Sequence, residues 1–144
     1  MAFSGNFMCT SFKVELLKGI HNFTAASNVF KLALYTNSAS FNATTTAYTS
    51  GNEVSGTNYT AKGNAITTVT PTSSSTTAFV DANDVVFSNV TISAVRGALF
   101  YNEAASGDPT VAVLDFGSDK AASAGDFTVV MPTGDASNAI IRIA

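Results

Sequence analysis

Short apolar runs recur along the chain from residue 65 onward. Each run is rich in β-branched or aromatic side chains, and groups of Pro, Gly, Asn, Asp and Ser separate the runs. Spacing of about eight to twelve residues between such runs is typical of antiparallel strands in a sandwich or barrel. The expected strands are 65–70, 76–80, 84–87, 90–95, 97–101, 111–116, 127–131 and 140–143.

Two further elements are expected before residue 65. Phe30, Leu32 and Leu34 alternate with other residues and predict a strand over 29–35. Residues 12–17 fit both the helical and the strand period, and Gly19 would end either element. We favour a short helix at 12–17.

Residues 1–11 form an N-terminal arm without a clear period. The arm carries Phe3, Phe7 and Met8 between small or polar residues, and Phe12 follows it directly. Apolar side chains in a terminal segment need a surface that covers them. That surface is either a neighbouring protein or the domain's own core, and the sequence leaves both alternatives open.

Residues 36–63 are the longest stretch without an apolar period. They are dense in Thr, Ser, Asn and Gly, and their only charged residues are Glu53 and Lys62. Long segments of this kind in compact domains are often functional. We expect a long polar loop here, with a short helix at 44–48 as the simpler alternative.

The pattern as a whole predicts an all-β fold. We expect one domain over 1–144, built as a single antiparallel β-sandwich of the jelly-roll or immunoglobulin-like type, with an extended N-terminal arm at 1–11 and a long loop at 36–63. A chain of 144 residues buries enough surface to fold without disulfides or metal ions.

Charge narrows the range of partners. Charged residues make up 12% of the chain, about half of the usual share, and the net charge is −3. Only seven basic residues are present and they are scattered, so we expect neither a nucleic-acid partner nor a membrane partner. The first residues lack the basic and apolar regions of a secretory signal, which favours assembly in a cytoplasm.

Residues with catalytic potential are few. Cys9 and His21 are the only thiol and the only imidazole, and no nucleophile motif or phosphate-binding loop is present. A Cys–His site would also need an orienting third group and a cleft. Cys9 fits a small buried apolar residue. We therefore expect no catalytic residues, no enzymatic activity and no cofactor.

Acidic residues offer one candidate metal site. Asp115, Asp119 and Asp126 could supply oxygen ligands to Ca²⁺, although their spacing differs from that of an EF-hand. Aspartates that form turns at strand ends explain them more simply. Asp81 and Asp84 could likewise form a carboxylate pair, but a tight hairpin turn accounts for them better.

Several side chains are candidates for contacts with other proteins. Arg96 and Arg142 are the only arginines and stand in apolar strand contexts, so each is either a paired structural residue or an interface anchor. The remaining candidates are large apolar or aromatic residues of the arm and of the 36–63 loop. The full set of interface candidates is Phe3, Phe7, Met8, Phe12, Tyr48, Tyr59, Arg96 and Arg142.

An ordered set of motifs resembles a known protein family. The motifs are FKLALYT at 30–36, AYTSGNEVSG at 47–56, RGALFYN at 96–102, VLDFG at 113–117, GDFT at 125–128 and IIRIA at 140–144. Together they resemble small virion proteins of tailed bacteriophages, whose members carry names that range from head protein to tail fibre. The resemblance implies a structural virion component without enzymatic activity, assembled in the cytoplasm of the host bacterium.

The leading hypothesis is a capsid decoration or cement protein. Its partners would be the major capsid protein and copies of itself, as a trimer or another symmetric oligomer. The uncharged arm and the 36–63 loop would meet other protein surfaces. The alternatives are a tail, tail-fibre or adaptor component, or a β-sandwich module that binds a receptor or a carbohydrate; the absence of Trp weighs against carbohydrate binding.

Overall fold

Over the residues that the structure describes, the chain folds as an all-β sandwich with one short helix. The structure is a computed structural model that describes residues 3–25 and 27–144. Met1 and Ala2, the first residues of the predicted arm, lie outside the described part. The elements in chain order are β1 (Phe7–Met8), α1 (Thr10–Leu17), β2 (Phe30–Thr36), β3 (Asn64–Ile66), β4 (Thr72–Ser74), β5 (Thr77–Val80), β6 (Val85–Asn102), β7 (Thr110–Val129) and β8 (Ile141–Ile143).

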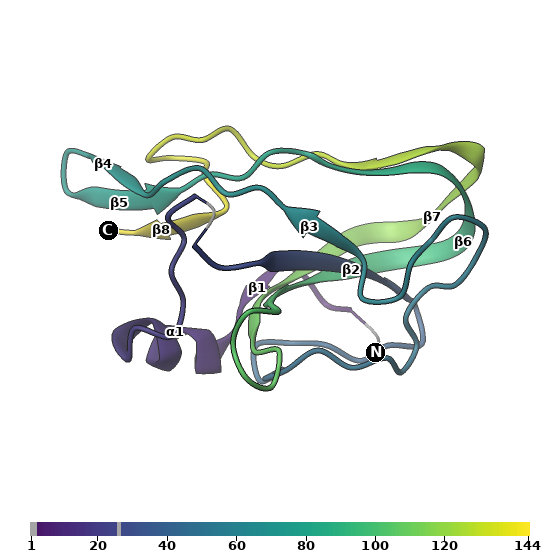
Figure 1. Cartoon of the computed structure of the whole chain (residues 1–144), viewed down its shortest axis with the longest axis horizontal. Coiled ribbons are helices and arrows are strands. Elements are labelled where there is room, and N and C mark those ends of the chain that lie inside the picture. Colours follow the sequence, from purple (N-terminus) through teal and green to yellow (C-terminus); the bar gives the residue numbers. More distant parts are fainter. Residues whose placement is uncertain (1–2, 26) are drawn as a thin grey trace.

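Two antiparallel sheets pack together, which confirms the predicted sandwich. The larger sheet has the strand order β1-β7-β6-β2-β3, and the smaller one has the order β4-β5-β8. In Figure 1, the small sheet and α1 lie at one end of the molecule, and the bend in the middle of strands β6 and β7 lies at the other. Across the described residues, α1 included, no helix is long and apolar enough to cross a membrane.

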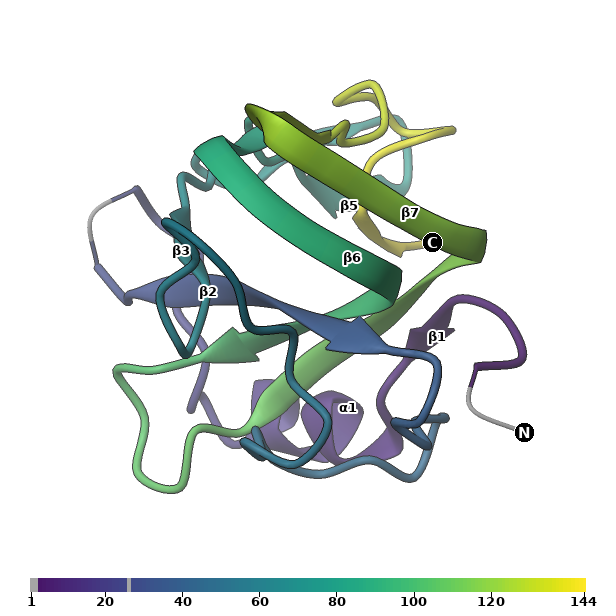
Figure 2. The ribbon, with the colours of Figure 1, turned by 90° about the vertical axis from the view of Figure 1, so that its right-hand side faces the viewer.

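The β6–β7 pair is the largest element of the fold. The sequence predicts separate strands at 84–87, 90–95 and 97–101, and this division is wrong because β6 runs without interruption from Val85 to Asn102. Irregularities in the pairing with β7 break its apolar period. Bulges strengthen the twist of a ribbon and bend it, and the ribbon folds back over the larger sheet (Figures 1 and 2).

The bend lets β6 contribute to the core twice. Near the start of the strand, the inward positions carry apolar side chains and the outward positions are exposed. Near its end, where β2 and β7 flank it, both faces are buried. The inward residues of the first half are Val85, Phe87, Val90, Ile92 and Val95.

The N-terminal segment folds back onto its own domain. Strand β1 pairs with β7 at Val113 and Ala112, and the Asn6 side chain accepts a hydrogen bond from the Asp115 amide at 2.7 Å. Phe3 is buried and packs edge-to-face on Phe41. This is the second of the two alternatives that the sequence leaves open. The predicted helix after the arm is confirmed, although it begins earlier, at Thr10.

The 36–63 segment is a loop tied to its neighbours. Single bridges connect Glu53 to Tyr35, Ala47 to Pro109 and Thr57 to Thr91. The alternative of a helix at 44–48 is wrong, because residues 43–44 form a turn and Ala47 pairs across to Pro109. The loop therefore runs along the sandwich as an ordered covering.

The interpretation of Asp81 and Asp84 as ends of a hairpin turn is also wrong. Strand β5 pairs with β4 and β8, whereas β6 pairs with β2 and β7, so residues 81–84 cross from one sheet to the other. Asp84 stabilises this crossing, because its carboxylate accepts a hydrogen bond from the Met131 amide at 2.8 Å. The sequence predicts no strand between 70 and 76, but strand β4 lies there.

A substitution at Gly97 tests how tightly the N-terminal arm packs on the bent β6–β7 ribbon. A methyl group at Gly97 would collide with the Leu114 carbonyl oxygen and the Phe3 ring. We expect Gly97→Ala to lower the free energy of unfolding by about 1–3 kcal/mol in urea titrations. Gly125→Ala is the matched control, because its nearest neighbour there would be the Ser123 carbonyl at 3.7 Å. Equal stability of the two variants would contradict this packing.

Candidate functional site

Glu53 is the centre of a polar network in the 36–63 loop. One of its carboxylate oxygens accepts a hydrogen bond from the Tyr48 hydroxyl at 2.6 Å. The other oxygen accepts hydrogen bonds from the Tyr59 hydroxyl at 2.8 Å and from the Lys62 amide at 2.7 Å. Three donors on one carboxylate offset the cost of removing its charge from water. The loop is thereby closed around Glu53.

The tyrosines connect this network to the strands. The Tyr59 hydroxyl also accepts a hydrogen bond from the Leu34 amide of β2 at 2.9 Å. The Tyr101 hydroxyl of β6 donates to the Lys62 carbonyl at 2.7 Å, and the Tyr101 ring stacks on Tyr48 with 5.0 Å between centroids. Tyr35, the one tyrosine of the chain not yet described, donates a hydrogen bond to the Thr49 carbonyl. All four tyrosines therefore fasten the loop to the sandwich.

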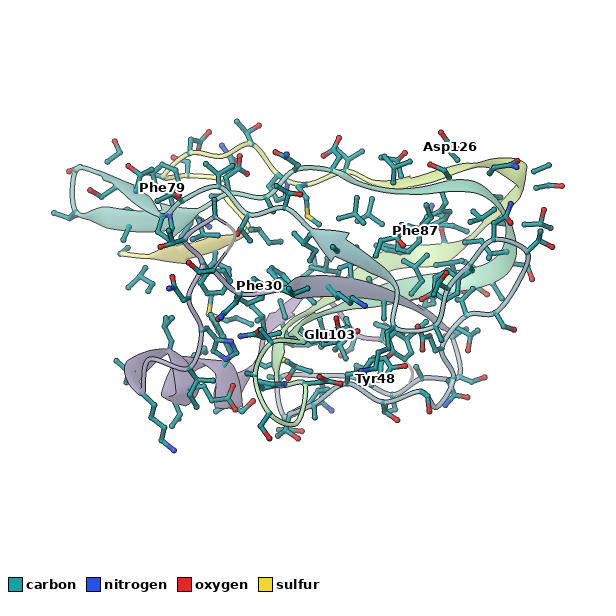
Figure 3. All side chains as sticks on the ribbon, in the orientation of Figure 1. Phe30, Tyr48, Phe79, Phe87, Glu103 and Asp126 are labelled. Atoms are coloured by element: carbon teal, nitrogen blue, oxygen red, sulfur yellow. The ribbon has the colours of Figure 1, made fainter. Side chains whose placement is uncertain are left out.

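Lys62 joins the loop to the turn between β6 and β7. Its ammonium group lies 3.0 Å from the Asp108 carboxylate and 3.5 Å from that of Glu103, and it stands 5.6 Å from the Tyr48 ring centre. The hydrogen bond to Asp108 is the main reason why the pKa of Lys62 is raised. Tyr48 and Glu103 mark this region in Figure 3. These contacts lie near the surface and stabilise the fold modestly.

The environment keeps the tyrosine hydroxyls protonated. Burial is the largest cause that raises the pKa of Tyr35, Tyr48, Tyr59 and Tyr101 above the usual value, and the nearby Glu53 carboxylate raises each pKa further. Each hydroxyl therefore acts as a hydrogen-bond donor at neutral pH. The network is suited to holding the loop in place, because none of its hydroxyls is activated toward ionisation.

The aromatic interface candidates fall into two groups. Phe3 and Phe12 lie in the domain's own core, so neither is accessible as a surface anchor in this structure. Phe7 and Met8 are half-buried on edge strand β1, and Tyr48 and Tyr59 are half-buried with their hydroxyls bound to Glu53. Folding back of the arm explains the first group, because the sandwich needs these side chains to close its own edge.

The two arginines have different environments. Arg96 forms an internal ion pair across the β6–β7 ribbon, with its Nε 3.0 Å from the Asp115 carboxylate. A hydrogen bond from the Gly117 amide, followed by this arginine, holds the pKa of Asp115 below its usual value. Arg142 is exposed on β8, where it donates to the Ala136 carbonyl at 3.5 Å. Arg96 is thus a paired structural residue, and Arg142 is open to solvent.

The candidate calcium ligands are not brought together. Asp115 is bound to Arg96, and Asp126 accepts a hydrogen bond from the Asn89 amide at 2.8 Å. The expected loop between them is wrong, because Lys120 and Ala122 pair with β6 inside the continuous strand β7. Across residues 3–25 and 27–144, no three His, Cys, Asp or Glu side chains group as metal ligands would.

Cys9 and His21 also have structural environments. Cys9 is fully buried, and this burial raises the pKa of its thiol, which disfavours the nucleophilic thiolate. The buried His21 ring lies 2.9 Å from the Glu15 carboxylate through Nε2 and 3.2 Å from the Asn102 amide nitrogen through Nδ1. His21 therefore links helix α1 to the end of β6.

Sequence reasoning missed the partners of Glu53. The signal available in the sequence is that Glu53 is one of only two charged residues in 36–63 and has tyrosines on both sides. Distances between Glu53 and its donors depend on the loop's path, which the local pattern does not encode.

Comparisons with known proteins add no assignment. A scan against protein-family models, a search of curated proteins and a search of solved structures each found no match.

Replacing Glu53 tests whether this network holds the loop. In Glu53→Gln, an NH2 group that can only donate replaces one of the two acceptor oxygens. The groups around position 53 are themselves donors, so this NH2 group lacks an acceptor there. We expect the free energy of unfolding to fall by about 1–3 kcal/mol in urea titrations. The control is Glu103→Gln, which breaks ion pairs with Lys31 and Lys62 near the surface and should cost about 1 kcal/mol or less. A Glu53→Gln variant as stable as the control would show that the network contributes little.

Because the tyrosine pKa values are raised in the folded protein, we expect the protein to lose stability at alkaline pH. The unfolded chain releases the tyrosine protons first, and stability falls as pH rises above about 10. Tyrosinate absorbance should therefore rise together with the loss of near-ultraviolet circular dichroism. In denaturant, the same groups should titrate near pH 10. Tyrosine ionisation well before unfolding would contradict the described burial.

Proposed function

We propose that the chain is a non-enzymatic structural protein of a tailed-bacteriophage virion. Within that class, the proposal is a capsid decoration or cement protein bound to the outside of the head. The resemblance of the motifs from 30–36 to 140–144 to those of small phage virion proteins is the basis for the proposed virion role. The β-sandwich is compatible with this role but is shared by many functions, so the side chains have to carry the argument.

The observation that carries the proposal is that the side chains with catalytic potential are bound by hydrogen bonds within the domain. The Glu53 carboxylate is bound by Tyr48 and Tyr59, and the His21 ring is bound by Glu15 and Asn102. A catalytic site presents such groups to a substrate. In this chain the same groups hold a loop and a helix against the sandwich, as a structural component requires.

The surface supports a role in assembly. A rigid loop loses little conformational entropy when a partner binds it. The loop over 36–63 is fixed by backbone bridges and by the Glu53 network before any partner is present. We therefore propose the major capsid protein and copies of this chain as partners, in a trimer or another symmetric oligomer. The virion would be its final location, after assembly in the host cytoplasm.

Gold-labelled antibodies and electron cryomicroscopy of the virion test this proposal. Labelling over the whole head surface would support a decoration protein. Labelling confined to the tail would overturn the decoration role and favour a tail or adaptor component. An absence of label on intact and on disrupted virions would overturn the virion assignment itself.

A further inference from the structure

The outer face of α1 combines exposed apolar and basic side chains. Residues three or four positions apart share one face of a helix, so Lys13, Val14, Leu17 and Lys18 lie together. Leu17 is 91% exposed and Val14 is 50% exposed, although neither is needed to shield the core. Burial of Leu17 against a partner would therefore contribute free energy that the folded chain alone does not gain.

An apolar groove lies between α1 and the small sheet β4-β5-β8. It has a volume of about 110 Å³, and α1 contributes Leu16 to its lining, the neighbour of Leu17 in sequence. Helix α1 and the small sheet lie at the same end of the molecule in Figure 1. Phe79, which is labelled in Figure 3, stands on the sheet side of the groove. Its other principal lining residues are Leu16, Phe23, Pro71, Ile141 and Ile143. We call the outer face of α1 together with this groove the α1 surface.

The charges of the α1 surface are unbalanced. Lys31, Lys62 and Arg96 form ion pairs with acidic residues. Lys13 and Lys18 form none with the described residues, and the same holds for Lys120 on β7 and Arg142 on β8. Lys13 and Lys18 differ from those two because both lie close to the exposed Leu17, and Glu15, the acid between them in sequence, is bound to His21. The α1 surface is therefore apolar and positively charged, although the whole chain carries a net charge of −3.

We infer that the α1 surface docks on a protein surface that carries acidic side chains around apolar ones. Carboxylates on the partner would pair with Lys13 and Lys18, while apolar side chains would cover Leu17 and enter the groove. This inference rests on the proposed function, in which the partner is the major capsid protein. It replaces the N-terminal arm by α1 as the docking element, because the arm is used in the domain's own fold.

The charges of the α1 surface disfavour two other occupants. A symmetric pair of copies meeting through it would bring Lys13 and Lys18 of both chains together, and such like-charge contacts are unfavourable. A lipid bilayer would need more positive charge than the α1 surface provides. Recognition of anionic lipids uses clusters of about four to eight basic residues, whereas α1 and its C-terminal flank offer two.

The test is co-sedimentation with phage heads that lack this protein. Leu17→Glu and the double variant Lys13→Glu/Lys18→Glu change the α1 surface. The controls are Val130→Glu, at an exposed valine beside Phe116 and Phe127, and Lys120→Glu on β7. We expect the first two variants to bind at least about tenfold more weakly and the controls to bind within about twofold of the unaltered chain. Thermal unfolding of each variant checks that the fold is retained, which the exposure of Leu17 favours.

The outcomes separate the inference from the proposed function. If the unaltered chain does not bind heads, the proposed function fails and the inference fails with it. If the unaltered chain binds and the α1 variants bind equally well, the inference alone is overturned. It is also overturned if light scattering shows a dimer that Leu17→Glu dissociates, or if vesicles of anionic phospholipid bind the chain and Lys13→Glu/Lys18→Glu abolishes that binding.

Discussion

The bend of the β6–β7 ribbon is the constraint on which the rest of the structure depends. The same two strands pair with β1 and β2 in the larger sheet and then cover that sheet with their other halves. The bend places Gly97 under the Phe3 ring, and the N-terminal segment packs on the ribbon at this point. It also places Phe87 5.6 Å from Tyr59, so the 36–63 loop packs on the ribbon's first half. The bent hairpin therefore provides the surface on which both the N-terminal segment and the 36–63 loop pack.

The loop is held by partly buried polar contacts because it has few apolar ones. A carboxylate that is partly removed from water needs donors, and Glu53 receives three of them from its own loop. Tyr59 then links that carboxylate to the Leu34 amide of β2. Each of these donors is held in place by its own packing or hydrogen bonds, as in the stacked Tyr48 and Tyr101 rings. The loop is therefore held on the sandwich by side-chain contacts, although it has no strand pattern.

The sequence predicts those parts of the fold in which local pattern and pairing agree. The alternation around Phe30 to Leu34 is enough to define β2, because the large side chains of that run lie in the core. In β7 the prediction fails between Gly117 and Asp126, because small and polar residues there resemble a loop and only the pairing with β6 makes them a strand. The prediction also divides β6 into three strands, because bulges interrupt the alternation of apolar and polar residues along it. The partners of Glu53, and the exposure of Leu17, depend on contacts that no local period encodes.

Scarce charge makes the position of each unpaired charge informative. A chain with many surface ions can leave several of them unpaired without consequence, since exposed ion pairs contribute little to stability. Here few charges exist, and Lys31, Lys62 and Arg96 are paired with acids within the fold. Lys120 and Arg142 form no ion pair with the described residues, and each lies on a strand away from α1. Lys13 and Lys18 stand apart on α1, beside Leu17 and next to an apolar groove. Because folding leaves both the charge and the apolar area of this surface unmatched, an acidic and apolar partner would gain from both at once.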